Sequence, residues 1–281
     1  MTAPAPNPIE SDGGLDAVLE VLQGRKLAIL TGAGLSTDSG IPDYRGAGAP
    51  PRNPMTFQQF LADEDYRKRY WAGSHLGWQR FSSVTPNAGH RAVAALEASG
   101  VATGVITQNV DGLHRRAGSL RVIELHGSMD RVRCLDCGQF YSRRDIASQL
   151  AHRNPWLDRV TERELGPDGD VIIEDPSAFD VPVCGVCGGM LKPDVVYFGE
   201  FVPSAQFRAA SAIIGAADAL LVAGSSLVVN SGMRLLDQAI KRGHPTVIVN
   251  RGPTKGDPRA TVKLDAGTSE VLTVLAKELR G

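Results

Sequence analysis

The chain has 281 residues, of which 42% are hydrophobic and 22% are charged, and its 30 basic residues nearly balance 31 acidic ones. This composition is typical of a globular protein with a sizeable core, and it argues against broad electrostatic binding of DNA or anionic membranes. No apolar run approaches the roughly 18 residues of a membrane helix, and residues 1–14 lack the apolar stretch of a signal peptide. We therefore expect a cytoplasmic protein with no membrane or nucleic-acid partner.

Short apolar runs alternate with amphipathic stretches along most of the chain. After a flexible tail over residues 1–14, strands are predicted at 26–31, 103–107, 121–125, 194–198, 219–223 and 246–249. Helices are predicted at 12–22, 57–70, 87–98, 205–217, 231–242 and 269–279. Strands that are apolar throughout are buried on both faces, as in a parallel sheet. The alternation therefore predicts an α/β fold, a Rossmann-like doubly wound parallel sheet.

Two segments interrupt this alternation. Residues 128–192 contain all four cysteines and a Gly-Pro-Asp-Gly-Asp turn at 166–170, so we interpret them as a small inserted zinc-binding module. The Rossmann-like domain then comprises residues 15–127 and 193–281. Within it, residues 41–90 form a second departure, in which several prolines bound a loop and one or two helices.

The cysteines form two Cys-x-x-Cys pairs, Cys134 with Cys137 and Cys184 with Cys187. In a reducing compartment this spacing indicates a metal site before a disulfide. Four thiolates satisfy a tetrahedral zinc ion and leave no open position, so the predicted zinc is structural. The alternatives are free thiols or redox pairs.

Glycine follows the first predicted strand in the segment Gly32, Ala33, Gly34 and Ser36. Glycines at such a point allow a sharp turn and close approach to a pyrophosphate. The dinucleotide fingerprint places a third glycine where this chain has Thr37, so a plain strand-to-helix turn remains an equal alternative.

Polar or glycine-rich segments also follow four other predicted strands. They are Gln108 to Asp111, His126 with its following glycine, Gly224 to Ser226, and Asn250 to Gly252. Taken alone, the Gly224 and Asn250 segments are more often loop starts, and a lone histidine is more often a structural side chain. The Gln108 to Asp111 segment is as often an ordinary polar turn. Parallel strands bring these ends to one edge of the sheet, which favours a nucleotide crevice with a histidine that can accept a proton.

Seven ordered motifs together resemble those of the sirtuins, a family of NAD-dependent protein lysine deacylases. They are Gly-Ala-Gly-Leu-Ser at 32–36 with Ser-Gly-Ile-Pro-Asp-Tyr-Arg at 39–45, Thr-Gln-Asn-Val-Asp at 107–111, Leu-His-Gly at 125–127, the four cysteines, Lys-Pro-Asp-Val-Val-Tyr-Phe-Gly-Glu at 192–200, Gly-Ser-Ser-Leu at 224–227 and Val-Asn at 249–250. The resemblance runs from about Leu15 to the C-terminus.

The resemblance implies an enzyme that transfers the acyl group of lysine to ADP-ribose and releases nicotinamide. It implies His126 as general base, with Asn109 and Asp111 orienting the reacting ribose, water and nicotinamide. The other implied NAD contacts are Gly32, Ala33, Gly34, Ser36, Tyr44, Arg45, Gln108, Val110, Gly224, Ser225, Ser226, Asn250, Arg251, Gly252 and Thr268. An acyl-lysine protein substrate would lie as an extended strand between residues 198–200 and 227–229.

The long segment between the cysteine pairs departs from the commonest sirtuin pattern. Together with Arg-Tyr-Trp at 69–71 it resembles the subgroup that contains the mitochondrial lipoamidase and ADP-ribosyltransferase sirtuin. The leading hypothesis is a deacetylase or deacylase, and the alternative is a protein mono-ADP-ribosyltransferase that uses the same NAD site. A non-catalytic binding module is a third reading, which the presence of His126, Asn109 and Asp111 argues against.

Overall fold

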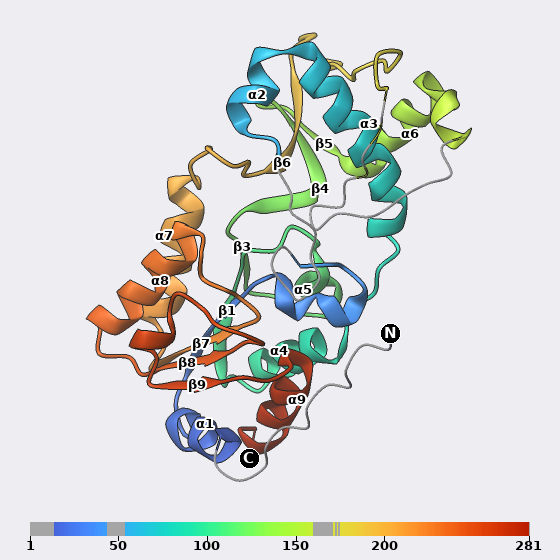
Figure 1. Cartoon of the computed structure of the whole chain (residues 1–281). Helices are drawn as coiled ribbons and strands as arrows, with labels where there is room; N and C mark the ends of the chain where they lie inside the picture. The colour runs from blue at the N-terminus through green and yellow to red at the C-terminus, as the bar shows by residue number, and fades with distance from the viewer. Residues whose placement is uncertain (1–13, 44–53, 160–170, 172, 174, 281) are drawn as a thin grey trace.

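The computed structural model describes residues 14–43, 54–159, 171, 173 and 175–280 (Figure 1). Its main element is a six-stranded sheet in the order β3-β2-β1-β7-β8-β9. The strands are β1 Leu27–Thr31, β2 Ala102–Thr107, β3 Val122–Glu124, β7 Ala219–Ala223, β8 Thr246–Val249 and β9 Val262–Leu264. Every neighbouring pair is parallel, which confirms the predicted α/β class.

Helices cover both faces of this sheet. One face carries α1 Gly14–Leu22, α4 Ala88–Ala98 and α9 Thr268–Glu278, and the other carries α7 Ser204–Gly215 and α8 Asn230–Lys241. Alternation within β1 explains how both faces are filled, because Leu27 and Ile29 join the first core while Ala28 and Leu30 join the second. Each fully buried leucine or isoleucine contributes about 1.5–3 kcal/mol to this packing.

A second, smaller sheet is antiparallel and has the order β5-β4-β6. Its strands are β4 Gly127–Cys134, β5 Phe140–Ser142 and β6 Leu191–Val195, and α6 Arg143–Arg153 packs beside them. Helices α2 Phe57–Ala62 and α3 Glu64–Phe81 share the core of this module, in which Phe60 and Trp71 meet Val132 and Ile146. The domain boundaries inferred from the sequence remain a prediction.

The remaining short elements are η1 Ala33–Leu35, η2 Thr37–Ser39, α5 Leu113–Arg116, η3 Pro155–Arg159 and η4 Asp257–Arg259. Among the described residues, no helix combines the length and apolar character that a membrane span requires.

One predicted strand belongs to a different sheet. The apolar run at residues 194–198 predicts a strand of the parallel sheet, but β6 ends at Val195 and pairs antiparallel with β4 in the small sheet. An apolar run looks the same in either sheet, so hydrophobicity does not reveal its partner. Pro193 is the available signal, because proline lacks the N–H that a central strand needs and β6 is an edge strand. The strand β9 is not predicted, because Lys263 interrupts its two apolar residues.

Candidate functional site

The two halves of the parallel sheet meet between β1 and β7, where the strand order reverses. In open α/β sheets, ligands bind outside the carboxyl ends of the strands at such a point. The loops after β1 and β7 contact one another here, since the Gly34 amide donates to the Gly224 carbonyl at 2.9 Å. Gly224 has φ +69°, and a Cβ atom there would lie 2.4 Å from the Leu35 nitrogen. Glycine is therefore required at Gly224 by the packing of the two loops.

A cleft of about 2110 Å³ opens at this edge and extends toward the small module. Its walls contain most of the site residues predicted from the sequence. They are Ala33, Gly34, Ser36, Gln108, Asn109, Val110, Asp111, His126, Gly224, Ser225, Ser226, Asn250, Arg251, Gly252 and Thr268. Gly32 is not part of the wall and packs against Gly224 and Ser225. Tyr44 and Arg45 lie outside the described residues.

A chain of hydrogen bonds joins the loop after β1 to the segment after β2. Asn109 Nδ2 donates to the Gly32 carbonyl at 3.0 Å and to Ser36 Oγ at 3.1 Å. Ser36 Oγ in turn donates to Asp111 Oδ2 at 2.7 Å. Burial raises the pKa of Asp111, and the hydrogen bond from Ser36 opposes that rise. The three polar side chains therefore hold each other in fixed positions on the cleft wall.

His126 lies between β3 and β4 and lines the same cleft. Its Nδ1 lies 3.0 Å from the carbonyl oxygen of Gln108, which can only accept, so the proton is assigned to Nδ1. The lone pair is then on Nε2, which lies 2.8 Å from Ser231 Oγ. Burial lowers the pKa of His126 below its ordinary value of 6.5, although the Gln108 carbonyl opposes this. The imidazole is neutral at pH 7 and can accept a proton at Nε2.

The glycine after this histidine has a packing role. Gly127 has φ +82°, and a Cβ atom there would lie 1.9 Å from the Asp194 carbonyl oxygen on β6. The His126 carbonyl accepts a hydrogen bond from the Val196 amide at 2.8 Å. The close pairing of β4 with β6 therefore needs glycine at position 127, and the bond from Val196 fixes the backbone of His126.

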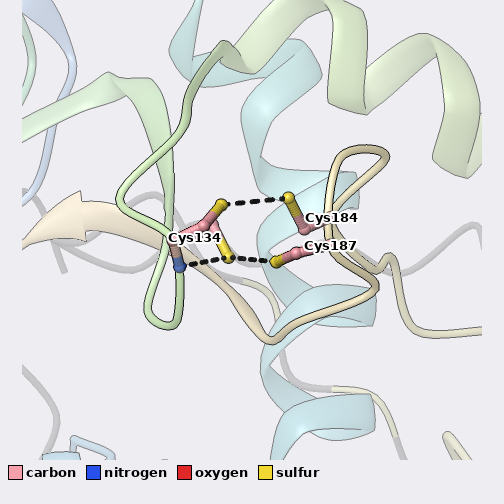
Figure 2. A group of neighbouring side chains, drawn as sticks. Cys134, Cys184 and Cys187 are labelled. Carbon is pink, nitrogen blue, oxygen red and sulfur yellow. Dashed lines mark hydrogen bonds between the residues drawn. The ribbon is translucent and has the colours of Figure 1, made fainter.

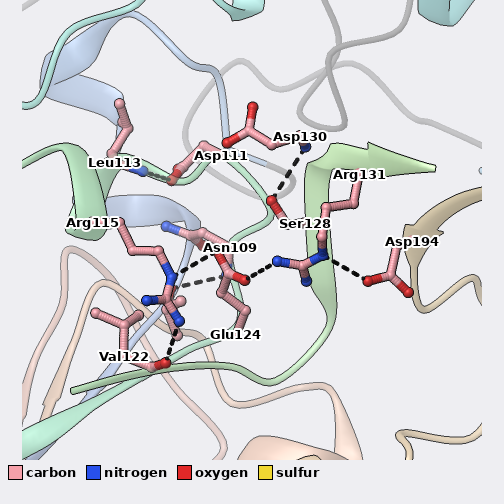
Figure 3. Close-up of polar contacts among 11 residues, drawn as sticks. Asn109, Asp111, Leu113, Arg115, Val122, Glu124, Ser128, Asp130, Arg131 and Asp194 are labelled. Atoms are coloured by element: carbon pink, nitrogen blue, oxygen red, sulfur yellow. Dashed lines mark hydrogen bonds and ion pairs between the residues drawn. The ribbon is translucent and has the colours of Figure 1, made fainter. Parts of the chain in front are cut away.

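An ion-pair network joins β4 to β3 and β6 (Figure 3). Arg131 contacts Glu124 at 3.1 Å and Asp194 at 3.0 Å. Arg115 contacts the other Glu124 oxygen at 3.6 Å, and its side chain also donates to the Val122 carbonyl. These pairs connect α5, β3, β4 and β6, so they hold the small module against the parallel sheet next to the cleft.

Ser231 is a site residue that the sequence motifs do not identify. It is the second residue of α8, and it is 8% exposed. The chain reaches it through Leu227, whose φ of +54° is uncommon for a residue other than glycine. Ser225 supports this turn, because its Oγ accepts from the Leu227 amide at 3.2 Å and donates to Gln108 Oε1 at 2.6 Å. The sequence feature that could have identified Ser231 is its position just after the glycine- and serine-rich loop at 224–226.

The far end of the cleft is formed by the segments after β8 and β9. Asn250 Nδ2 donates to the Arg251 carbonyl at 2.7 Å, and Lys263 Nζ donates to the Asn250 carbonyl at 2.6 Å. Thr268 Oγ1 donates to the Gly34 carbonyl at 3.3 Å, which joins the start of α9 to the loop after β1. The predicted residues Asn250, Arg251, Gly252 and Thr268 therefore lie on the same wall as the glycine loops.

The opposite end of the cleft reaches the small module. Val171 and Ile173, from the segment between the cysteine pairs, line it, and the Val171 amide donates to the Gly73 carbonyl of α3 at 3.1 Å. Residues 198–200 and 227–229, which are predicted to flank a substrate strand, also line the cleft. No sequence motif identifies Val171 and Ile173 individually as cleft residues, and the contact of Val171 with Gly73 of α3 depends on the tertiary structure.

The four cysteines form one cluster (Figure 2), and none of them lines the cleft. All four sulfur atoms lie within 4.8 Å of one another, with Cys134 3.6 Å from Cys187 and Cys137 3.7 Å from Cys184. Thiolates about 2.3 Å from a tetrahedral zinc are about 3.8 Å apart, so the cluster fits one zinc ion. Tyr141 adds a contact that the sequence does not reveal, since its hydroxyl lies 3.0 Å from Cys184 Sγ. With four protein ligands, the ion would have no open position.

The fold and cleft define a Rossmann-like α/β protein with an inserted four-cysteine module. The Sir2 family profile matches residues 32–231, and the chain belongs to the Sir2 family. It is 54% identical over 266 residues to NAD-dependent protein deacetylase 1 of Mycobacterium avium, covering 93% of this chain and 94% of that protein. It is 48% identical over 269 residues to NAD-dependent protein deacetylase 1 of Streptomyces coelicolor, covering 94% and 90% of the two chains.

Solved structures of the family agree with the fold. A structure of Sir2 with a p53 peptide and NAD+ has a TM-score of 0.76 and 32% identity, covering 95% of this chain and 98% of that one. A structure of Sir2 with an inhibitor, 2′-O-acetyl-ADP-ribose and a deacetylated p53 peptide has a TM-score of 0.73 and 31% identity, covering 94% and 98%.

Proposed function

We propose that this protein is an NAD-dependent protein lysine deacylase, with deacetylation as its main reaction. One observation carries the proposal: a neutral His126 presents Nε2 to a large cleft at the switch point of the sheet. The names of the relatives support it, because both proteins described above are NAD-dependent protein deacetylases. The acyl group of lysine passes to ADP-ribose, and nicotinamide leaves.

The chemistry requires a base, orientation of the reactants and exclusion of water. NAD supplies the activated ribose carbon and the nicotinamide leaving group when it is bound. We assign His126 Nε2 to accept the proton of a ribose hydroxyl, because Gln108 fixes the other ring nitrogen as a donor. Asn109 and Asp111 are assigned to orient the ribose and the nicotinamide amide.

The remaining predicted contacts divide along the cleft. Gly32, Ala33, Gly34 and Ser36 are assigned to the pyrophosphate side, and Gly224, Ser225 and Ser226 to phosphate and ribose. Asn250 to Gly252 and Thr268 are assigned to the adenosine end. The acyl-lysine segment binds as an extended strand between residues 198–200 and 227–229, with backbone pairing on both sides. The cysteine cluster holds a structural zinc ion, and we propose a cytoplasmic location from the cysteine usage of the sequence.

The test incubates the protein with NAD and a panel of acyl-lysine peptides and measures nicotinamide and bare lysine by mass spectrometry. Nicotinamide and deacylated peptide in equal amounts are expected, with acetyl-lysine among the best substrates. His126→Ala should abolish turnover while NAD still binds in calorimetry. Nicotinamide together with ADP-ribose attached to protein would favour the mono-ADP-ribosyltransferase instead. No nicotinamide with any peptide would contradict both activities.

A further inference from the structure

Two of the arginines that line the cleft lie on neighbouring helices and form no ion pair with an acidic side chain among the described residues. Arg208 on α7 and Arg234 on α8 are exposed, and both line the cleft. Their helices pack side by side on one face of the large sheet (Figure 1). In the described part of the chain, the arginines that form ion pairs are others: Arg115, Arg131, Arg153 and Arg259. The charges of Arg208 and Arg234 are therefore available to a bound molecule.

Glu200, a carboxylate that lines the same cleft, is already neutralised by a partner inside the protein. Glu200 Oε2 accepts hydrogen bonds from Lys192 Nζ and from the Tyr197 amide, both at 3.0 Å. Lys192 is 1% exposed and its ammonium also lies 4.5 Å from the centre of the Tyr197 ring, so this pair is fixed inside the protein. Glu200 is therefore paired with Lys192 and does not neutralise Arg208 or Arg234.

Two phenylalanines, Phe201 and Phe207, accompany the arginines at this part of the cleft. The Arg234 guanidinium carbon lies 4.3 Å from the centre of the Phe207 ring, which restrains the arginine over α7. Phe201, in the segment before α7, lines the cleft and is 93% exposed. Aromatic side chains and arginines are the residue types enriched at surfaces that bind a partner.

We infer that the rim formed by Phe201, Arg208 and Arg234 selects acyl-lysine substrates that carry an aspartate or glutamate near the acyl-lysine. The inference rests on the proposed function, which puts the substrate strand beside this rim. An extended strand advances about 3.3 Å per residue, so acidic side chains within about three residues of the lysine can reach it. Complementary charge then strengthens binding of acidic segments and weakens binding of basic ones.

The test uses acetyl-lysine peptides that differ only in carrying Glu, Gln or Lys at one of the three positions on either side of the acetyl-lysine. At one or more positions, kcat/KM for the Glu peptide should exceed that for the Lys peptide about 3- to 10-fold, mainly through KM. The ratio should shrink as sodium chloride is raised from about 50 to 500 mM, because salt screens exposed charges.

Charge-reversal variants test whether the two rim arginines cause the preference for acidic peptides. Arg208→Glu and Arg234→Glu, checked for folding by circular dichroism, should reverse the order of the Glu and Lys peptides. Arg242→Glu at the opposite end of α8 makes the same change in net charge away from the cleft and should keep the original order. Equal kcat/KM for all three peptides, or an unchanged preference in the two rim variants, would overturn the inference. The proposed function would instead fail if no acetyl peptide were consumed at all.

Discussion

His126 depends on two hydrogen-bond partners that come from different parts of the chain. The Gln108 carbonyl fixes the proton on Nδ1, and the Ser231 hydroxyl occupies the lone pair of Nε2 at 2.8 Å. A donor to Nε2 stabilises the neutral ring, and burial acts in the same direction. Ser231 therefore holds the ring in its neutral tautomer, and a ribose hydroxyl must displace the serine hydroxyl from Nε2 before its proton can be transferred.

Replacement of Ser231 by alanine should lower kcat/KM about 3- to 10-fold, as expected for loss of one hydrogen bond. The pKa of His126 should rise, so the acidic limb of the pH profile should move to higher pH. Ser231→Thr keeps the hydroxyl, so the acidic limb of its pH profile should lie at the same pH as in the wild type. An alanine variant with the wild-type pH profile would show that Ser231 has no influence on the base.

At the scale of elements, the two cysteine turns contribute directly to the core of the small module. Cys134 and Cys184 are buried there beside Val132, Ile146 and Leu191, whereas Cys137 and Cys187 are exposed. Four thiolates this close repel one another unless a cation neutralises them. The module is therefore expected to depend on zinc for its folded state.

Elemental analysis should find one zinc ion per chain, and Cys184→Ser should lose most of it. A strong chelator should lower the melting temperature, because binding of a structural zinc contributes to folding free energy. Tyr141→Phe removes only the hydroxyl beside Cys184 and should retain the metal. A metal-free wild-type protein with an unchanged melting curve would contradict a structural role for zinc.

At the scale of the whole molecule, two buried histidines join the large sheet to its helices. The rings of His90 on α4 and His114 on α5 have centres 5.0 Å apart. His114 Nε2 lies 2.9 Å from Thr31 Oγ1 of β1. Burial and the nearby Arg116 lower the pKa of His90 to about 4, and burial lowers the pKa of His114 well below 6.5. Both rings are therefore neutral in the folded protein near neutral pH.

This pair should make the protein less stable in mild acid. Below pH 6.5 the unfolded chain binds a proton at both histidines, whereas the folded chain does not. Each histidine therefore lowers the free energy of unfolding by about 1.4 kcal/mol for every unit by which the pH falls. The loss should begin near pH 6.5 and continue toward pH 4 for His90. Urea unfolding between pH 7.5 and about 5 measures it. His114→Gln should have a shallower pH dependence than the wild type, and equal slopes would contradict the prediction.

Local patterns in the sequence determined the class of the fold and the ends of its strands. Apolar runs of four to six residues such as β1 and β7 can only be buried on both faces, and the glycines after them mark where the chain turns. Two Cys-x-x-Cys pairs in one chain indicate a metal site in a reducing compartment. Features such as these depend on near neighbours in the chain, so they can be predicted from it.

Only the tertiary structure decided which distant residues meet. Ser231 reaches His126 across 105 positions, and the strand at Leu191–Val195 pairs with β4 instead of joining the parallel sheet. Helices α2 and α3 pack into the small module, and the arginines of the rim on α7 and α8 line the cleft. These relations follow from how whole elements dock to bury apolar surface, and the short-range pattern of residues does not specify that docking.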